Sequence, residues 1–211
     1  MMDTALIELL GSATEPSQRA EPDDPTSQRI LEAALREAST VGLARLTVED
    51  VVRRAGVARM TVYRRFPRRD DLVGALVRRE TQRFLAAVAD GIEQADDPRD
   101  GVAEAFIAAA RFARRHPILR RAAHTESALS PAENAKLLDL GAIFIAGHIH
   151  GEAPGTPSQP VRWVADVFAR LFMTYLAAPP TNPDFDDDDE LRRFAHAVLT
   201  PMIDRALSAG R

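Results

Sequence analysis

The sequence predicts an all-α protein of about nine helices, with three short helices near the N-terminus followed by a larger helical region. Apolar residues recur at helical spacing along most of the chain, and capping residues, prolines and glycines separate these stretches. No segment of useful length alternates apolar and polar residues as a half-buried strand would. With 211 residues and a hydrophobic content of 45%, the chain is long enough to form one or two ordinary cores.

Composition excludes several kinds of site. The chain has no cysteine, so it forms neither disulfides nor thiolate metal sites. No apolar run reaches the roughly 18 residues that a membrane span needs, and Met1–Leu10 lacks the basic residues of a signal peptide. We therefore expect a cytoplasmic protein that does not enter the membrane. Because no serine–histidine–acid set and no glycine-rich phosphate loop has a convincing context, we expect neither an enzyme nor a cofactor.

The histidines and acidic runs do not predict a metal site. His148 and His150 are two residues apart on a predicted helix, where their side chains point about 200° apart. Asp186–Asp189 precedes a predicted helix, and carboxylates there suit the positive end of the helix dipole. We expect no bound metal.

The first elements are an extension and one amphipathic helix. Residues 1–26 contain polar stretches broken by proline, and we expect them to form a flexible extension. A helix follows from about Ser27, with Ile30 and Leu31 on its apolar stripe, and it ends at Gly42.

The stretch from Thr47 to Arg69 contains two short amphipathic helices that meet at Gly56. The hydroxyl of Thr47 is suited to cap the first helix, and Gly56 permits the positive φ that ends a helix abruptly. The second helix runs from about residue 58 to 65 and directs Val62 inward. This arrangement predicts a helix-turn-helix, whose second helix enters the major groove of DNA.

The outward face of the second helix carries the chemistry of DNA recognition. Arg59 and Met60 come first on this face, where side chains reach base edges, and Met60 suits a thymine methyl group. The other members are polar or basic, and most of them are expected to hold phosphates, which position a protein without specifying sequence. The predicted DNA-contacting residues are Thr47, Arg59, Met60, Thr61, Tyr63, Arg64, Arg65 and Arg69, with Thr47, Thr61, Tyr63, Arg65 and Arg69 assigned to phosphates.

Charge is distributed unevenly along the chain. The net charge is −4, yet the segment from Ser27 to Glu80 holds 12 arginines against seven acidic residues, so the rest of the chain carries −9. A basic end on an acidic body steers that end toward phosphate. The alternative to a DNA-binding surface is a pair of core helices with a solvated basic face.

Six further helices complete the prediction. Pro67 ends the third helix, and Asp70 begins a long fourth helix. A capping box at 130–133 begins the seventh, and Pro201 is expected to kink the last. The later helices are predicted at 70–94, 99–115, 118–124, 131–150, 161–178 and 189–207.

The segment from Ser27 to Glu80 resembles the TetR family of repressors. The run TVEDVVRRAGV, continued by TVYRRFPRRDDL, carries the resemblance, and ILEAALREASTVGL matches the first helix of the family. Three positions depart from the common pattern, at Ala38, Ala58 and Arg69. Ala58 stands where the family often has a serine or threonine, and alanine cannot cap the recognition helix.

The resemblance implies a domain organisation and a function. It implies a flexible extension over 1–26, a helix-turn-helix DNA-binding domain over 27–72, and a helical ligand-binding and dimerisation domain over 73–211. Such a protein is a homodimer that binds a pseudo-palindromic double-stranded DNA operator. A small-molecule effector releases it, so we expect a transcriptional repressor. The alternative is a helical partner-binding or enzymatic protein with a vestigial helix-turn-helix head.

The resemblance also suggests residues in the body. Large side chains there are candidates for the effector pocket, and apolar residues of the last two helices are candidates for the dimer interface. Ordinary core packing is the alternative for each, because periodicity does not separate these faces. The pocket candidates are Phe106, Phe112, His124, Phe144 and Trp163, and the interface candidates are Val164, Phe168, Leu171, Phe194, Val198 and Met202.

Overall fold

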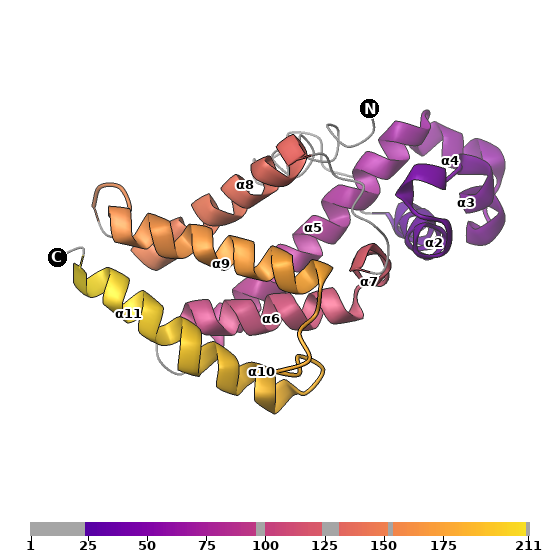
Figure 1. Cartoon of the computed structure of the whole chain (residues 1–211). Coiled ribbons are helices and arrows are strands. Elements are labelled where there is room, and N and C mark those ends of the chain that lie inside the picture. Colours follow the sequence, from indigo (N-terminus) through magenta and orange to yellow (C-terminus); the bar gives the residue numbers. More distant parts are fainter. Residues whose placement is uncertain (1–23, 96–99, 124–130, 152–153, 210–211) are drawn as a thin grey trace. The chain divides into compact units, whose positions relative to one another are not determined.

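The structure is a computed structural model, and it describes residues 24–95, 100–123, 131–151 and 154–209 (Figure 1). These residues are helical almost throughout, and an isolated bridge between Thr181 and Asp184 is the extent of β structure among them. The described part contains nine helical rods when α10 (Asp188–Phe194), η3 (Ala195–Leu199) and α11 (Thr200–Ala209) are taken as one and the single turn η1 (Leu43–Arg45) is set aside. The predicted all-α class is confirmed.

The chain divides into two compact units. The N-terminal unit comprises the described residues of Met1–Arg83 together with His116–Ala122, and the C-terminal unit comprises those of Phe84–Arg115 and Ala123–Arg211. One long helix contributes residues to both units. The division by function that the sequence predicts, at residues 26 and 72, stays a prediction.

The N-terminal unit is built from short helices and the first part of a long one. Its first helix begins two residues before the predicted start, because Asp24 caps it by accepting hydrogen bonds from the amides of Thr26 and Ser27. The elements are α2 (Pro25–Val41), η1 (Leu43–Arg45), α3 (Val48–Ala55), α4 (Arg59–Arg65), α5 (Arg69–Glu93, to Arg83 in this unit) and α7 (Pro117–Ala123, to Ala122 in this unit).

A single apolar core holds these helices together. Ile30 of α2, Val51 of α3, Val62 of α4 and Leu72 of α5 are all completely buried in it. These are the inward positions that helical periodicity predicts. The core therefore determines which faces of α3 and α4 remain exposed.

The C-terminal unit is a helical bundle in which α8 and α9 lie side by side, α9 packs against α11, and α6 packs against α9, α10 and η3 (Figure 1). None of the described helices combines the length and apolar composition that a bilayer-spanning helix needs. The elements are the rest of α5, α6 (Gly101–Arg115), α8 (Pro131–His150), α9 (Gln159–Ala177), α10 (Asp188–Phe194), η3 (Ala195–Leu199) and α11 (Thr200–Ala209).

The last rod departs from regular α-helix near Pro201, although one turn earlier than the sequence suggests. Residues Ala195–Leu199 form a π-helical turn between α10 and α11. Because Pro201 has no amide hydrogen, an α-helical hydrogen bond to the carbonyl of Ala197 cannot form. A widened turn before the proline accommodates this loss.

Candidate nucleic-acid interface

The geometry of α3 and α4 follows from local signals in the sequence. The Thr47 side chain accepts a hydrogen bond from the amide of Asp50 at 3.2 Å, which confirms Thr47 as the N-cap of α3. Gly56 adopts φ 61° and ends α3 in the left-handed conformation. Ala58 precedes α4 without a side-chain cap, and the completely buried Val62 anchors this seven-residue helix in the core.

The face of α4 opposite Val62 is exposed, as its periodicity predicts. The side chain of Arg59 is 66% exposed, Met60 is 76% exposed, and Arg64 is also exposed. Thr61 and Tyr63 are half-buried. Exposure of a long apolar side chain such as Met60 leaves it free to contact a partner.

Arg59 and Tyr63 converge on one carboxylate. Oε1 of Glu49, in the first turn of α3, accepts hydrogen bonds from the Tyr63 hydroxyl at 2.7 Å and from Arg59 Nη2 at 3.1 Å. The Arg59 guanidinium lies 5.3 Å from the centre of the Tyr63 ring, within range of a cation–π interaction. The hydrogen bond from Tyr63, together with the charge of Arg59, lowers the pKa of Glu49.

The structure gives Arg65 an internal partner, and its predicted role as a phosphate contact stays a prediction. Its side chain is only 19% exposed, and its Nη2 donates to Oδ1 of Asp24 at 3.0 Å. Its Nε donates to the Ser27 hydroxyl at 3.1 Å. The physical reason is that Arg65 lies at the C-terminal end of α4, where it meets the capped N-terminus of α2.

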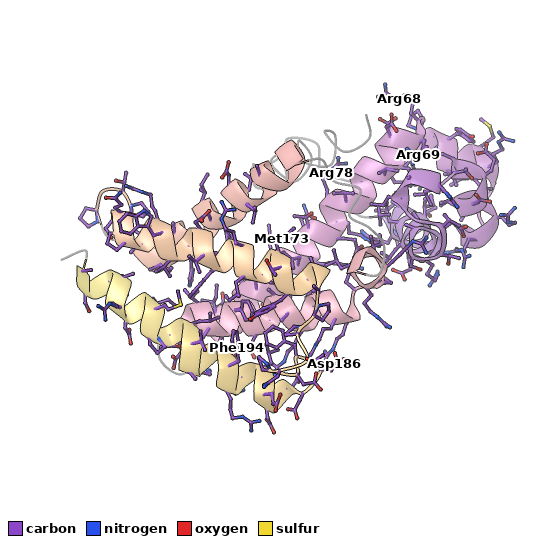
Figure 2. The ribbon with its side chains drawn as sticks, in the orientation of Figure 1. Arg68, Arg69, Arg78, Met173, Asp186 and Phe194 are labelled. Carbon is purple, nitrogen blue, oxygen red and sulfur yellow. The ribbon has the colours of Figure 1, made fainter. Side chains whose placement is uncertain are left out.

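Arg69 also has internal hydrogen-bond partners within the unit, and its predicted role as a phosphate contact stays a prediction. It lies at the start of α5 (Figure 2), and its Nε donates to the carbonyl of Leu46 at 2.7 Å. Its Nη2 donates to the carbonyls of Leu43 and Ala44. Leu43 and Ala44 belong to η1, and Leu46 is the residue that follows it. Arg69 therefore ties α5 to the segment before α3.

Two further residues of this unit lie outside the predicted set. Glu49 is an acidic residue of the exposed surface, and its position beside the apolar stripe in the first turn of α3 is its signal in the sequence. Arg68 has a side chain that is 80% exposed and pairs with Asp71 at 2.9 Å. Its signal was its place in the arginine run beside Pro67.

The structure separates the five candidates for an effector pocket. Phe106 is buried and Phe112 is half-buried, and both contact other aromatic rings of the C-terminal unit. Phe144 is 44% exposed and Trp163 is 62% exposed, so neither lines the interior of its unit, and their assignment is corrected. Ring size alone does not show which way a side chain faces. His124 lies outside the described residues.

The candidates for a dimer interface differ in their burial. Phe168 is only 2% exposed, which corrects its assignment to an intersubunit face. Val198 is 40% exposed and stays a candidate. The exposed apolar face of α9 instead holds Trp163 and Val167, which are four residues apart. The remaining candidates, which are partly buried against the core of their own unit, are Val164, Leu171, Phe194 and Met202.

Known proteins resemble this chain in sequence. The profile of the bacterial regulatory proteins of the TetR family matches residues 30–76, which include α3 and α4. The transcriptional repressor LfrR of Mycolicibacterium smegmatis is 31% identical over 173 residues, which cover 81% of this chain and 88% of LfrR. An uncharacterised helix-turn-helix regulator of Mycobacterium tuberculosis is 26% identical over 87% of this chain and 90% of its own length.

Solved structures of low sequence identity share the fold. A TetR-like transcriptional regulator from a Rhodococcus species superposes with a TM-score of 0.57 at 18% identity, covering 92% of this chain and all of that one. The helical arrangement is therefore common to both proteins over nearly their full lengths.

Proposed function

This chain belongs to the TetR family of bacterial regulatory proteins and is a DNA-binding transcriptional regulator, and we propose that it is a repressor that binds a pseudo-palindromic operator as a homodimer. The observation that carries this proposal is the exposed face of α4, where the side chains of Arg59, Met60 and Arg64 point away from the apolar core. A two-fold dimer would present two such helices to major grooves about 34 Å apart on one side of the duplex.

The internal hydrogen bonds of Arg65 and Arg69 reduce the number of residues that we propose to contact DNA. Arg65 and Arg69 hold α4 and α5 in place and are proposed as positioning residues. Arg59 and Met60 are proposed to read base edges, because they stand at the N-terminal end of α4. The proposed DNA-contacting set is Thr47, Arg59, Met60, Thr61, Tyr63 and Arg64.

Selection of DNA by the purified protein tests this proposal. Sequencing of the enriched duplexes should yield a two-fold symmetric site, and binding to it should weaken steeply as salt rises. Arg59→Ala should weaken binding to that site by about 1–3 kcal/mol and relax the preference at one base position. Met60→Ala should relax a preference for thymine. Enrichment of no sequence, or binding that does not depend on salt, would contradict the proposal.

An exposed apolar face supports the proposed homodimer. Trp163 and Val167 project from α9, and Val198 and Leu207 project from η3 and α11. Exposed large apolar side chains on neighbouring helices commonly mark a protein–protein interface. Each subunit would contribute the same face, as a two-fold interface requires.

We also propose a small, partly apolar effector that binds within the C-terminal unit. Half-buried rings support this proposal, since Phe84 contacts Phe112 at 5.5 Å and Phe172 at 6.0 Å between ring centres. An effector releases the operator only if it binds the released conformation more tightly than the bound one. A thermal-shift screen of small apolar compounds, followed by operator release and by Phe112→Ala, tests this step. A compound that stabilises the protein without weakening operator binding would be a ligand but not an effector.

A further inference from the structure

Glu49 places a carboxylate within the basic surface of α3 and α4. Its side chain is 56% exposed, and its Oε1 accepts hydrogen bonds from both the Tyr63 hydroxyl and Arg59 Nη2. The guanidinium of Arg59 lies over the ring of Tyr63 at the same time. These three side chains, the Glu49 cluster, link the first turn of α3 to α4.

The Glu49 cluster orients Arg59 and leaves some of its N–H groups available for further hydrogen bonds. A guanidinium has five N–H donors in a fixed plane, and Glu49 engages Nη2. Within the described residues, Nε and Nη1 of Arg59 have no hydrogen-bond acceptor. An arginine whose plane is held by an ion pair and a ring is pre-organised to present its remaining donors to a third group.

The charge of Glu49 discriminates between the two kinds of acceptor on DNA. A phosphate is anionic, so its approach to Arg59 is opposed by the carboxylate that already holds the guanidinium. The acceptors on a guanine edge, O6 and N7, are uncharged, so Arg59 can donate to them while it keeps its contact with Glu49. The low pKa of Glu49 keeps this carboxylate ionised at neutral pH.

We infer that Glu49 is a specificity-determining positioning residue, which directs Arg59 to base edges and withholds it from phosphates. This inference rests on the proposed function. Binding to random DNA depends on phosphates, whereas binding to an operator also depends on base contacts. Glu49 therefore weakens binding to random DNA more than binding to the operator. The Tyr63 hydroxyl also donates to Glu49, and its proposed phosphate contact is the same on operator and random DNA. Its contribution therefore cancels, and the ratio of the two affinities reports on Arg59.

Glu49→Gln tests this inference, because glutamine keeps a hydrogen-bond acceptor and removes the charge. The full-length wild type and variant are titrated with the selected operator duplex and with a scrambled duplex of the same length at several salt concentrations. We expect the affinity for the scrambled duplex to rise about 3-fold per subunit, or about 10-fold for a dimer. Its salt slope should steepen by about 0.9 for each phosphate gained. Operator affinity should change by less than about 3-fold, so the specificity ratio falls.

Asp70→Asn provides the matched control. Asp70 is an exposed carboxylate of the same unit, paired with Arg69 and not with α4, so this variant makes the same change in net charge. It should change both affinities by the same factor and leave the specificity ratio as in the wild type.

The outcomes separate this inference from the proposed function. An unchanged ratio in Glu49→Gln, or a fall confined to operator affinity, would overturn the inference and leave the proposed function standing. Failure to enrich any duplex would overturn the proposed function instead. The scrambled duplex would then still show whether Glu49 opposes phosphate binding.

Discussion

The guanidinium of Arg65, in the last turn of α4, is hydrogen-bonded to the carboxylate of Asp24, which caps the N-terminus of α2. One carboxylate thus performs two tasks, since it satisfies amides at the start of α2 and holds the end of the recognition helix. The arginine run of α4 is therefore divided by tertiary structure. Arg59 and Arg64 face outward, and Arg65 supports the fold.

Asp24→Asn should make the protein less stable near neutral pH, and this difference should shrink as the pH falls below the ordinary carboxyl pKa. The hydrogen bond from Arg65, reinforced by Ser27, holds the pKa of Asp24 well below its ordinary value of 3.8. A carboxylate whose pKa is lowered on folding stabilises the protein above its unfolded-state pKa. That stabilisation is lost as the pH falls through the folded-state pKa. We expect the variant to melt about 2–4 °C lower at pH 7.

Melting curves of the wild type and Asp24→Asn between pH 3 and pH 7 provide the measurement. The difference in melting temperature should be full above about pH 5 and should shrink below pH 4. Asparagine still caps a helix, so the cap itself is preserved. A difference that stays constant over this range would show that the charge of Asp24 contributes nothing.

Arg69→Met should lower stability while leaving the electrostatics of DNA binding unchanged. The guanidinium of Arg69 serves three backbone carbonyls, and its loss should decrease the free energy of unfolding by about 1–2 kcal/mol, which urea titration followed by circular dichroism measures. Because these carbonyls hold the side chain, the salt slope of operator binding should match that of the wild type. A slope smaller by about one per subunit would instead place Arg69 on a phosphate.

Val167→Glu and Phe168→Ala should separate association from folding. Val167 is 44% exposed on α9, so a charge there should convert the proposed dimer to a monomer in light-scattering chromatography and leave the helical content unchanged. Phe168 is 2% exposed, and its truncation should lower the free energy of unfolding by about 3–5 kcal/mol. A Val167→Glu variant that remains dimeric would exclude this part of α9 from the interface.

Gly91→Ala should destabilise the C-terminal unit, although alanine is the better helix former. A β-carbon at Gly91 would lie 2.7 Å from Cβ of Ala108 and 3.1 Å from the carbonyl oxygen of Glu104. The α5 and α6 backbones would have to separate, at a cost of about 1–3 kcal/mol. Gly147→Ala is the control and should be neutral or stabilising, because its added β-carbon would meet nothing within 4 Å beyond its chain neighbours and the backbone of its own helix. Equal stability of both variants would show that α5 and α6 are not packed this closely.

The sequence predicts the helix boundaries of the helix-turn-helix correctly, because each boundary depends on neighbouring residues alone. The Thr47 cap, the left-handed Gly56 and the inward Val62 are consequences of chain geometry over fewer than two helical turns. Helical periodicity and capping residues likewise predict the helices of the C-terminal unit. They do not identify the start of α2, because Asp24-Pro25 reads equally well as a loop.

The sequence alone therefore determines the helical class, the order of the helices and the exposed basic face of α4. Three-dimensional packing decided which side chains of that face are available, since Arg65 finds Asp24 and Arg69 finds the carbonyls beside Leu46. It also decided that Phe168 is core while the adjacent Val167 is exposed. The physical reason is that periodicity specifies the angle of a side chain about its own helix. The partner on the facing helix comes from residues far away in the chain.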